Sequence, residues 1–491
     1  MSACFIFDNS YALLPDRLYT RLNPTPVTAP RLVKLNAALA VSLGLDPEAL
    51  ASPECVEVLA GNRVPEGASP IALAYAGHQF GQFVPLLGDG RAILLGEVVG
   101  RDGERHDIQL KGSGLTPFSR SGDGRAALGP VLREYIVSEA MAALGVPTTR
   151  ALAVVTTGQP VLRETVLPGA VLTRVAASHI RVGTFQYAAI QGAETVRLLA
   201  DHVIARHYPE ASAGEFPYRA LLEAVVARQA ELMARWLLVG FIHGVMNTDN
   251  TSVAGETIDY GPCAFMDAYD PAKVFSSIDY AGRYAYGNQP RIAQWNLARF
   301  AETLLPLLGE DEKQAVAVAQ GALTDFVACF QASYRGGLQR KIGLTTEREG
   351  DAALAQGLLT CMADNSADFT LTFRRLCDAA AGEEGDPAVR TLFADASAYD
   401  TWAAPWHRRL AEDNVDPDER RAAMRAVNPA FIPRNHLVEA AIAAAVTRDD
   451  FVPFEELVEV LTRPYEDRPG SQRYAAPPTP EERVQQTFCG T

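Results

Sequence analysis

Five polar residues have the types and the chain order of a magnesium–nucleotide site: Lys111, Glu134, Asp249, Asn250 and Asp259. A lysine on a strand can bind phosphates, and a glutamate on the next helix can orient that lysine. Asparagine and aspartate oxygens bind magnesium together with phosphate oxygens. Taken singly, the lysine and the glutamate are also explained as unpaired surface charges, and the loop residues as Asx turns. The ordered series, with a glycine loop before it, favours the nucleotide site.

The string HGVMNTDN, residues 243–250, departs from the usual pattern at one position. In kinase-like sites an aspartate ahead of the metal-binding asparagine accepts the proton of the substrate hydroxyl. That position is Val245 here, which leaves Asp249 as the candidate base. Either the protein binds nucleotide without catalysis, or the base has moved because another phosphorus reacts. In a reversed nucleotide the α-phosphate would face the acceptor, and nucleotidyl transfer with loss of pyrophosphate would replace phosphoryl transfer.

Glycines and arginines in several short strings point to a ligand that carries more than one phosphate. Glycine lets a backbone approach phosphate closely, and arginine is the preferred bidentate partner of phosphate. Solvated surface arginines are the alternative for each string taken alone. The residues concerned are Gly88, Gly90 and Arg91 in GDGR, Arg120, Asp123, Gly124 and Arg125 in SRSGDGR, and Arg174 and Arg181 in LTRVAASHIRVG.

The chain of 491 residues is too long for one compact core and predicts two or three lobes. Its net charge of −15 argues against a general nucleic-acid binder, which is usually basic. No run of about 18 apolar residues indicates a membrane span, and the N-terminus lacks the features of a signal or transit peptide. We therefore expect a cytoplasmic protein with no membrane or nucleic acid among its partners. The seven cysteines include no CxxC pair, which predicts buried or free thiols rather than a zinc site.

Hydrophobic periodicity predicts a small mixed region followed by a larger helical region. Glycine, proline and turn residues mark the ends of the predicted elements. Strands are expected at 91–99, 106–112, 148–158 and 170–178, helices at about 30–43, 127–147, 218–240, 290–308, 312–334, 351–364 and 436–447, and an irregular tail from Pro464. The strongest helix, 218–240, leads directly into the string HGVMNTDN.

Three longer strings resemble the selenoprotein O family, and the resemblance runs nearly the full chain. They are YAGHQFGQFVPLLGDGRAILLGE (75–97), DIQLKGSGLTPFSRSGDGRAALGPVLREYIVSEAM (107–141) and GFIHGVMNTDNTSVAGETIDYGPCAFMDAYDP (240–271). The resemblance implies an α+β, protein-kinase-like two-lobed fold, with a small mixed α/β N-lobe and a larger, mostly helical C-lobe carrying family-specific extensions. The implied parts are an N-terminal extension (1–65), the N-lobe (66–185), the C-lobe with the catalytic and metal loops (186–463) and a Pro-rich tail (464–491).

Members of this family are known as protein adenylyltransferases, which move AMP from ATP to Ser, Thr or Tyr hydroxyls of proteins while the ATP lies reversed in the cleft. The resemblance therefore implies ATP as a substrate, proteins as partners, and Mg²⁺ as the metal, with Mn²⁺ as an alternative. Asp249 matches the base, and Glu134 matches the glutamate that orients Lys111. The family's ATP-binding positions fall on Gly88, Gly90, Arg91, Lys111, Asp123, Gly124, Arg174, Arg181 and Asp259, and its metal ligands on Asn250 and Asp259.

Three other functions stay open. Use of UTP with manganese would make the protein a uridylyltransferase. A conventional kinase is a second alternative, and Val245 argues against it. A nucleotide-binding pseudokinase scaffold without catalysis is the third, and the intact Lys111, Asp249 and Asp259 argue against it.

The tail adds one expectation about redox control. Some relatives hold selenocysteine third from the C-terminus, where this chain has Cys489, whose thiol is less reactive than a selenol. In some bacterial relatives the tail cysteine bonds to a cysteine shortly beyond the Asp-Tyr-Gly motif. The matching stretch here, KVFSS (273–277), contains no cysteine, so Cys263 is the nearest candidate partner of Cys489.

Overall fold

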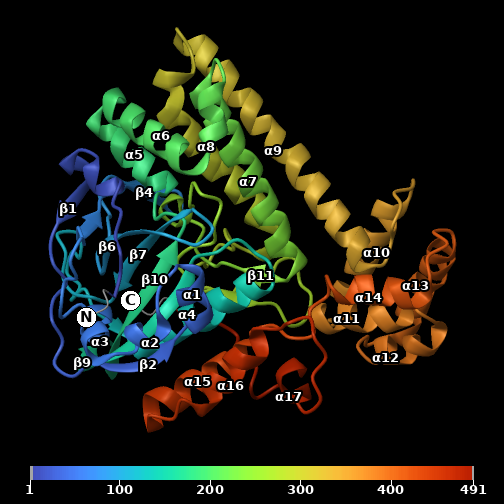
Figure 1. The fold of residues 1–491 in the computed structure, drawn as a ribbon. Helices are drawn as coiled ribbons and strands as arrows, with labels where there is room; N and C mark the ends of the chain where they lie inside the picture. Colours follow the sequence, from blue (N-terminus) through green and yellow to red (C-terminus); the bar gives the residue numbers. More distant parts are fainter. Residues whose placement is uncertain (1–3, 489–491) are drawn as a thin grey trace.

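The computed structural model describes residues 4–488, and within them a mixed α/β fold surrounds one antiparallel sheet (Figure 1). The strand order is β1-β3-β6-β7-β10-β9-β2, and β8 pairs with β10 beside this path. These strands are β1 (Tyr19–Arg21), β2 (Arg31–Leu35), β3 (Ile71–Leu73), β6 (Ala92–Val99), β7 (Arg105–Lys111), β8 (Ala126–Ala127), β9 (Arg150–Leu162) and β10 (Val166–Ala176). Two short antiparallel pairs stand apart from the sheet: β4 (Gly77–Gln79) with β5 (Gln82–Val84), and β11 (Phe241–Ile242) with β12 (Ala264–Phe265).

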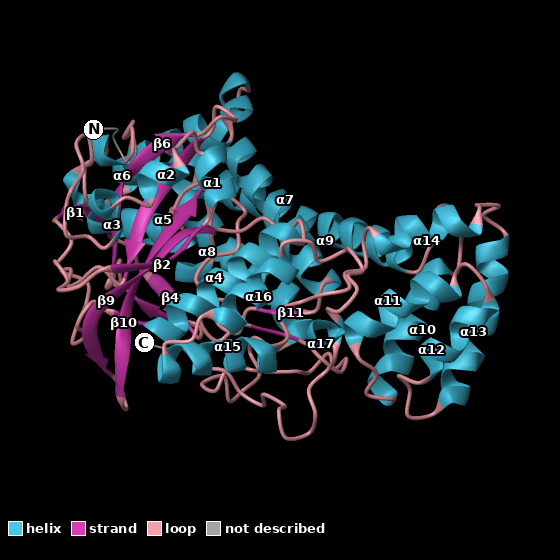
Figure 2. Ribbon diagram, turned by 60° about the horizontal axis from the view of Figure 1, so that its bottom comes forward, coloured by secondary structure: helices cyan, strands magenta, loops and turns pink. Residues whose placement is uncertain are grey.

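Most helices follow the sheet in the chain. Figure 2 shows the sheet at one end of the molecule, helices α10 to α14 at the other end, and α7 to α9 between them. The helices are α1 (Ala37–Ser42), α2 (Pro47–Leu50), α3 (Pro53–Leu59), α4 (Leu128–Ala143), α5 (Val182–Gln191), α6 (Ala193–His207), α7 (Pro217–Leu238), α8 (Gln289–Leu308), α9 (Glu312–Lys341), α10 (Asp351–Asp364), α11 (Phe369–Ala379), α12 (Asp386–Arg390), α13 (Ala396–Ala411), α14 (Pro417–Arg425), α15 (Asn435–Arg448), α16 (Val452–Leu461) and α17 (Gln472–Ala475).

The central strands β6, β7 and β10 are buried along most of their length because both faces of the sheet are covered. On one face, helices α1 to α3 share a core with the sheet that includes Leu39, Leu59 and Ile108. On the other face, Leu132 of α4 shares a core with Leu172 of β10. The strands that carry Lys111 and Arg174 are therefore held rigidly from both sides.

Helix α4 is covered in turn by α15 and α16, which come near the end of the chain. Arg133 forms an ion pair with Glu439, and the Tyr135 ring lies 5.5 Å from the Phe454 ring. In Figure 1, α15 and α16 lie below α4. The helix that carries Glu134 thus depends on residues more than half the chain away.

Helix α7 delivers the chain to the candidate loop. It ends at Leu238, and Gly240, with a φ of 73°, turns the backbone into β11. The pairing of β11 with β12 joins Phe241 to Phe265 and Ile242 to Ala264. This pairing closes residues 243–263 into a loop whose two ends are fixed side by side.

Helix α9 is, in the described part of the chain, the one helix long and apolar enough to cross a membrane by length and composition alone. The mean hydropathy of its most apolar window is 1.3, and 22% of that window is buried. Polar residues interrupt the alanines and valines, so a search for unbroken apolar runs does not find it. Ala319, Ala322 and Phe326 belong to the core that α9 shares with α7 and α8.

Most elements lie where the periodicity predicts them. The four predicted strands correspond to β6, β7, β9 and β10, and the predicted helices from residue 127 onward correspond to α4, α7, α8, α9, α10 and α15. The tail after Pro464 is irregular except for the short helix α17.

The prediction of a helix at 30–43 is wrong for the first half of that range. Residues Arg31–Leu35 form strand β2, which pairs with β9, and α1 begins only after Asn36. The Asn36 side chain accepts a hydrogen bond from the N–H of Leu39 and caps the helix there. The edge of β9 offers hydrogen-bonding partners to residues 31–35, and this pairing outweighs their local preference for a helix.

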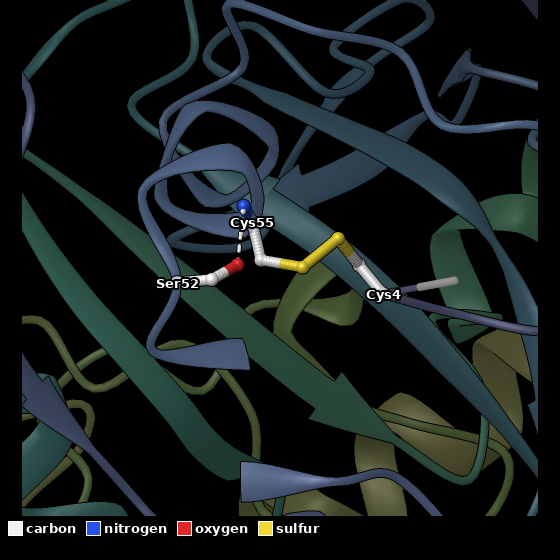
Figure 3. Close-up of a disulfide and its surroundings, with 3 residues drawn as sticks. All are labelled: Cys4, Ser52 and Cys55. Carbon is white, nitrogen blue, oxygen red and sulfur yellow. Dashed lines mark hydrogen bonds between the residues drawn. A yellow bond between two sulfur atoms is a disulfide. The ribbon is translucent and has the colours of Figure 1, made fainter. Parts of the chain in front are cut away.

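The expectation of free or buried thiols is wrong for two cysteines. Cys4 and Cys55 form a disulfide that ties the N-terminal segment to α3 (Figure 3). Ser52, the N-cap of α3, accepts the N–H of Cys55 at 3.3 Å. Cys263, Cys329, Cys361 and Cys377 are free thiols, as expected.

We predict that Cys4→Ser lowers the free energy of unfolding under oxidising conditions by about 2–4 kcal/mol, because the bond closes a loop between residues 51 apart in sequence. Urea unfolding with and without reductant measures the difference, which should vanish with reductant. Cys361→Ser is the matched control, because Cys361 is a free thiol. Alkylation of Cys4 and Cys55 in the folded, unreduced protein would contradict the prediction.

Candidate active site

A cavity of about 660 Å³ gathers the candidate residues from both regions of the fold. Its walls come from the GDGR turn, strands β7 and β10, helix α4, and the strings around Asp249 and Asp259. It brings together all of the residues that the sequence assigned to the nucleotide and metal site: Gly88, Gly90, Arg91, Lys111, Asp123, Gly124, Glu134, Arg174, Arg181, Asp249, Asn250 and Asp259. Val245 also lines this cavity, as do Arg120 and Arg125.

The carboxylate of Asp259 is held by three cations from three elements. Lys111 Nζ of β7 lies 3.1 Å from Oδ1, and Arg174 of β10 donates to the same oxygen at 2.5 Å. Arg181, the N-cap residue of α5, donates to Oδ2 at 3.0 Å. Asp259 has a φ of 62°, so its backbone is in the left-handed region, which this set of charged partners can hold in place.

Glu134 of α4 completes the cluster on its other side. It accepts from Lys111 Nζ at 2.5 Å and from Arg174 at 3.2 Å, and it is buried. Lys111 lies at the end of β7, opposite Leu172 of β10, and Arg174 lies opposite Gln109. The antiparallel register therefore sets both cations on the face of the sheet that α4 covers.

Three residues of this cluster were missed in the sequence. Asp89 is buried inside the GDGR string and pairs with Arg181 at 3.4 Å. Gln109 donates to Asp89 at 3.0 Å and accepts from Arg174 at 2.6 Å. The Tyr75 ring lies 4.5 Å from the Arg181 guanidinium. Gln109 could have been found, because it stands two residues before Lys111 and so shares its face of the strand.

The two aspartates of the cavity differ in their charge environment. Burial raises the pKa of Asp259, but the cations Arg174, Lys111 and Arg181 outweigh that effect and hold its pKa well below the usual range. Burial raises the pKa of Asp249 to about 6, and the opposing effects of the Arg181 charge and the Gln79 hydrogen bond are too small to cancel it. The site thus pairs one strongly acidic carboxylate with one that binds a proton more readily.

Asp249 lies on a single 3-10 turn, Thr248–Asn250, between the two paired strands β11 and β12. Among the residues that the structure describes, its Oδ1 is buried without a hydrogen-bond partner, and the amide of Gln79 donates to its Oδ2 at 3.5 Å. An acceptor atom of this kind can take a proton from a hydroxyl that enters the cavity.

The two glycine strings both pack against the segment 114–118. Gly88 has a φ of 71°, and a side chain there would lie 2.3 Å from the Phe118 ring. Gly124 has a φ of 67°, and a side chain there would collide with the Gly114 carbonyl. Close packing of the two loops requires glycine here, in addition to the approach to phosphate that the sequence suggested.

Two charged residues of these loops are bound by other parts of the protein. Asp123 forms an ion pair with Arg163, and the Arg125 guanidinium donates to the carbonyls of Thr25 and Pro26. Arg91 and Arg120 also line the cavity, where they can reach an anion.

A divalent metal fits the donor set at Asn250 and Asp259. The Asn250 Nδ2 donates to the Val245 carbonyl at 2.9 Å, which leaves its Oδ1 to bind a metal. Among residues 4–488, no group of three or more His, Cys, Asp or Glu side chains could hold an ion. Phosphate oxygens and water would therefore complete the shell of a magnesium ion bound between these two side chains.

Of the two cysteines considered for redox control, Cys263 and Cys489, the structure describes only Cys263. Cys263 is a buried free thiol, and burial raises its pKa to about 12. Cys489 lies outside the described residues. The nearby residue Thr487 does lie close to this region, because its hydroxyl donates to the Pro262 carbonyl at 2.6 Å.

Comparison with known proteins identifies the family. The family model described as protein adenylyltransferase SelO matches residues 4–462. Relatives named protein nucleotidyltransferase YdiU are 69% identical in Methylorubrum extorquens (strain PA1), 67% in Bradyrhizobium diazoefficiens and 66% in Rhodopseudomonas palustris (strain BisB5). Each of these alignments covers 100% of both chains. The chain therefore belongs to the SelO family of protein adenylyltransferases and is an enzyme of the nucleotidyltransferase class.

Proposed function

We propose that the enzyme transfers AMP from ATP to Ser, Thr or Tyr hydroxyls of proteins, in a kinase-like cleft where the ATP lies reversed. The observation that carries the proposal is the position of Asp249. Its carboxylate, whose Oδ1 has no hydrogen-bond partner among residues 4–488, lines the same cavity as the Lys111, Glu134 and Asp259 cluster, whereas Val245 stands where a kinase keeps its base. The cavity therefore holds a candidate base, Asp249, and a candidate phosphate-binding cluster, but the position of the kinase base holds a valine.

In the proposed reaction the basic cluster binds the triphosphate. Lys111, Arg174 and Arg181 converge on one point of the cavity, and cations placed there stabilise the charge that develops on the phosphates. Magnesium held by Asn250 and Asp259 would supply further positive charge. Glu134 keeps Lys111 and Arg174 oriented, since it contacts both side chains.

Asp249 accepts the proton of the acceptor hydroxyl. The hydroxyl oxygen forms a bond to the α-phosphorus, and the bond from that phosphorus to the bridging oxygen breaks. Pyrophosphate leaves with the electron pair of the broken bond, and AMP remains on the acceptor. Burial of Asp249 favours its role as a base, because a desolvated carboxylate binds a proton more tightly than an exposed one.

The proposal extends to the fold. A protein-kinase-like arrangement would assign strands β3 to β10 with α4 to an N-lobe at 66–185 and the helices α6 to α16 to a C-lobe within 186–463, with α5 spanning the boundary. The cavity that draws on both groups of elements supports this arrangement.

We predict that incubation with Mg–ATP and a generic protein acceptor adds adenylyl mass to the acceptor or to the enzyme itself. Intact-protein mass spectrometry measures the product. Added phosphoryl mass would identify a kinase, and uridylyl mass with Mn–UTP alone would identify a uridylyltransferase. Tight ATP binding without any added mass would favour a scaffold.

Asp259→Ala is expected to lower transfer by more than about 100-fold, because it removes a metal ligand and the counter-charge of three cations. Lys111→Ala should lower transfer strongly through lost phosphate positioning. The matched control is Asp270→Ala, which removes an exposed carboxylate outside the cavity. Full activity in either cavity variant would show that the site is misplaced.

Glu134→Gln keeps the shape of the side chain but removes the charge that orients Lys111 and Arg174. We expect kcat/KM to fall roughly 10- to 100-fold and the free energy of unfolding to fall by about 1–3 kcal/mol. Glu139→Gln is a control on the same helix, because Glu139 pairs with Arg150 at 2.6 Å away from the cavity. The free energy of unfolding of the Glu139→Gln variant should fall, while its transfer rate stays near that of the wild type. Equal rates in both variants would argue against the role of Glu134.

A further inference from the structure

The hairpin of β4 and β5 is attached to the loop that carries Asp249. The backbone N–H of His78 donates to Thr248 Oγ1 at 2.7 Å. The backbone N–H of Phe80 donates to Asn247 Oδ1 at 3.0 Å. Two adjacent side chains of the loop therefore bind two alternate amides of the hairpin.

Both anchors are fixed by further partners. The Thr248 hydroxyl donates to Gln186 Oε1 at 2.7 Å, and Gln186 Nε2 bonds to His78 Nδ1 at 2.8 Å, which closes a ring of polar contacts. Tyr284 Oη donates to Asn247 Oδ1 at 2.7 Å. Thr248 is fully buried, so water cannot replace a lost partner at low cost.

The anchored hairpin forms a wall against the Asp249 carboxylate. A side chain at Gly77 would lie 2.4 Å from Asp249 Oδ1, so the backbone there is in close contact with the carboxylate. Gln79 faces the other oxygen, 3.5 Å from Oδ2. The hairpin itself turns tightly through Phe80 and Gly81, whose φ values are 52° and 87°. Such a two-residue turn with both φ values positive leaves the hairpin little freedom to bend away.

We propose that Asn247 and Thr248 are positioning residues, which clamp the hairpin of residues 77–84 to the catalytic loop so that the hairpin fixes the Asp249 carboxylate toward the acceptor hydroxyl. The inference rests on the proposed function of Asp249 as the base. Its physical reason is that Asp249 lies on one 3-10 turn, which has no helix or sheet of its own to hold it. The position of the carboxylate is therefore set by what packs on the loop.

The test compares two substitutions at one residue. Thr248→Val keeps the size of the side chain but leaves the His78 amide and the Gln186 oxygen unpaired, whereas Thr248→Ser keeps the hydroxyl. We expect Thr248→Val to lower kcat for AMP transfer roughly 10- to 100-fold, with KM for ATP changed less than about twofold. Thr248→Ser should restore most of the rate. Thr303→Val is the matched control, because it removes a buried hydroxyl on α8 that does not line the cavity.

Hydrogen exchange of the peptide 77–84, read by mass spectrometry, supplies a measurement that does not need activity. The clamp predicts faster exchange of this peptide in Thr248→Val than in Thr248→Ser or Thr303→Val. If the wild-type enzyme transfers no nucleotide, the proposed function is wrong. The exchange rates would still test whether Thr248 holds the hairpin of residues 77–84 in place. Wild-type exchange and wild-type kcat in Thr248→Val would overturn the inference.

A second variant covers the case in which Thr248→Val does not fold. Gly77→Ala leaves both anchors intact but places a methyl group against Asp249 Oδ1. Displacement of the carboxylate should lower kcat roughly 10-fold or more while ATP binding, measured by calorimetry, stays near the wild-type value. Unchanged kcat in a folded Gly77→Ala enzyme would show that the hairpin does not set the position of Asp249.

Discussion

The carboxylate of Asp259 is the point on which the site depends. Lys111, Arg174 and Arg181 approach it from β7, β10 and the start of α5, so one acidic group joins two strands and a helix. Three buried or half-buried cations in one place require nearby negative charge, and Glu134 and Asp89 supply the rest. The cluster is balanced in charge, and its members therefore hold one another in position.

The sequence was most informative about the types of the site residues and least informative about their partners. Lys111, Glu134, Asp249 and Asp259 could be singled out because their order along the chain matches a known kind of chemistry. Asp89 and Asn247 could not, because their importance comes from contacts with residues far away in sequence. A buried aspartate inside a glycine turn looks like an ordinary turn residue until its distant cation is known.

Long periodic elements such as α7 and α10 were predictable because local pattern and tertiary burial agree there. Two features were not. Residues Arg31–Leu35 form a strand because β9 offers an edge, a fact that no local window contains. Cys4 and Cys55 are bonded because the N-terminal segment returns to α3, although cysteine spacing alone suggested separate thiols.

The cover that α15 and α16 form over α4 has a consequence for how the protein is made. A ribosome adds about 5–20 residues per second, so α4 emerges on the order of tens of seconds before the helices that pack against it. During that interval the apolar face of α4 that α15 and α16 later cover is without these two partners. Glu134 lies on this helix, so prematurely terminated chains lack the packing that sets its position. A chain that stops before α15 therefore lacks the cover that holds the helix of Glu134 in place.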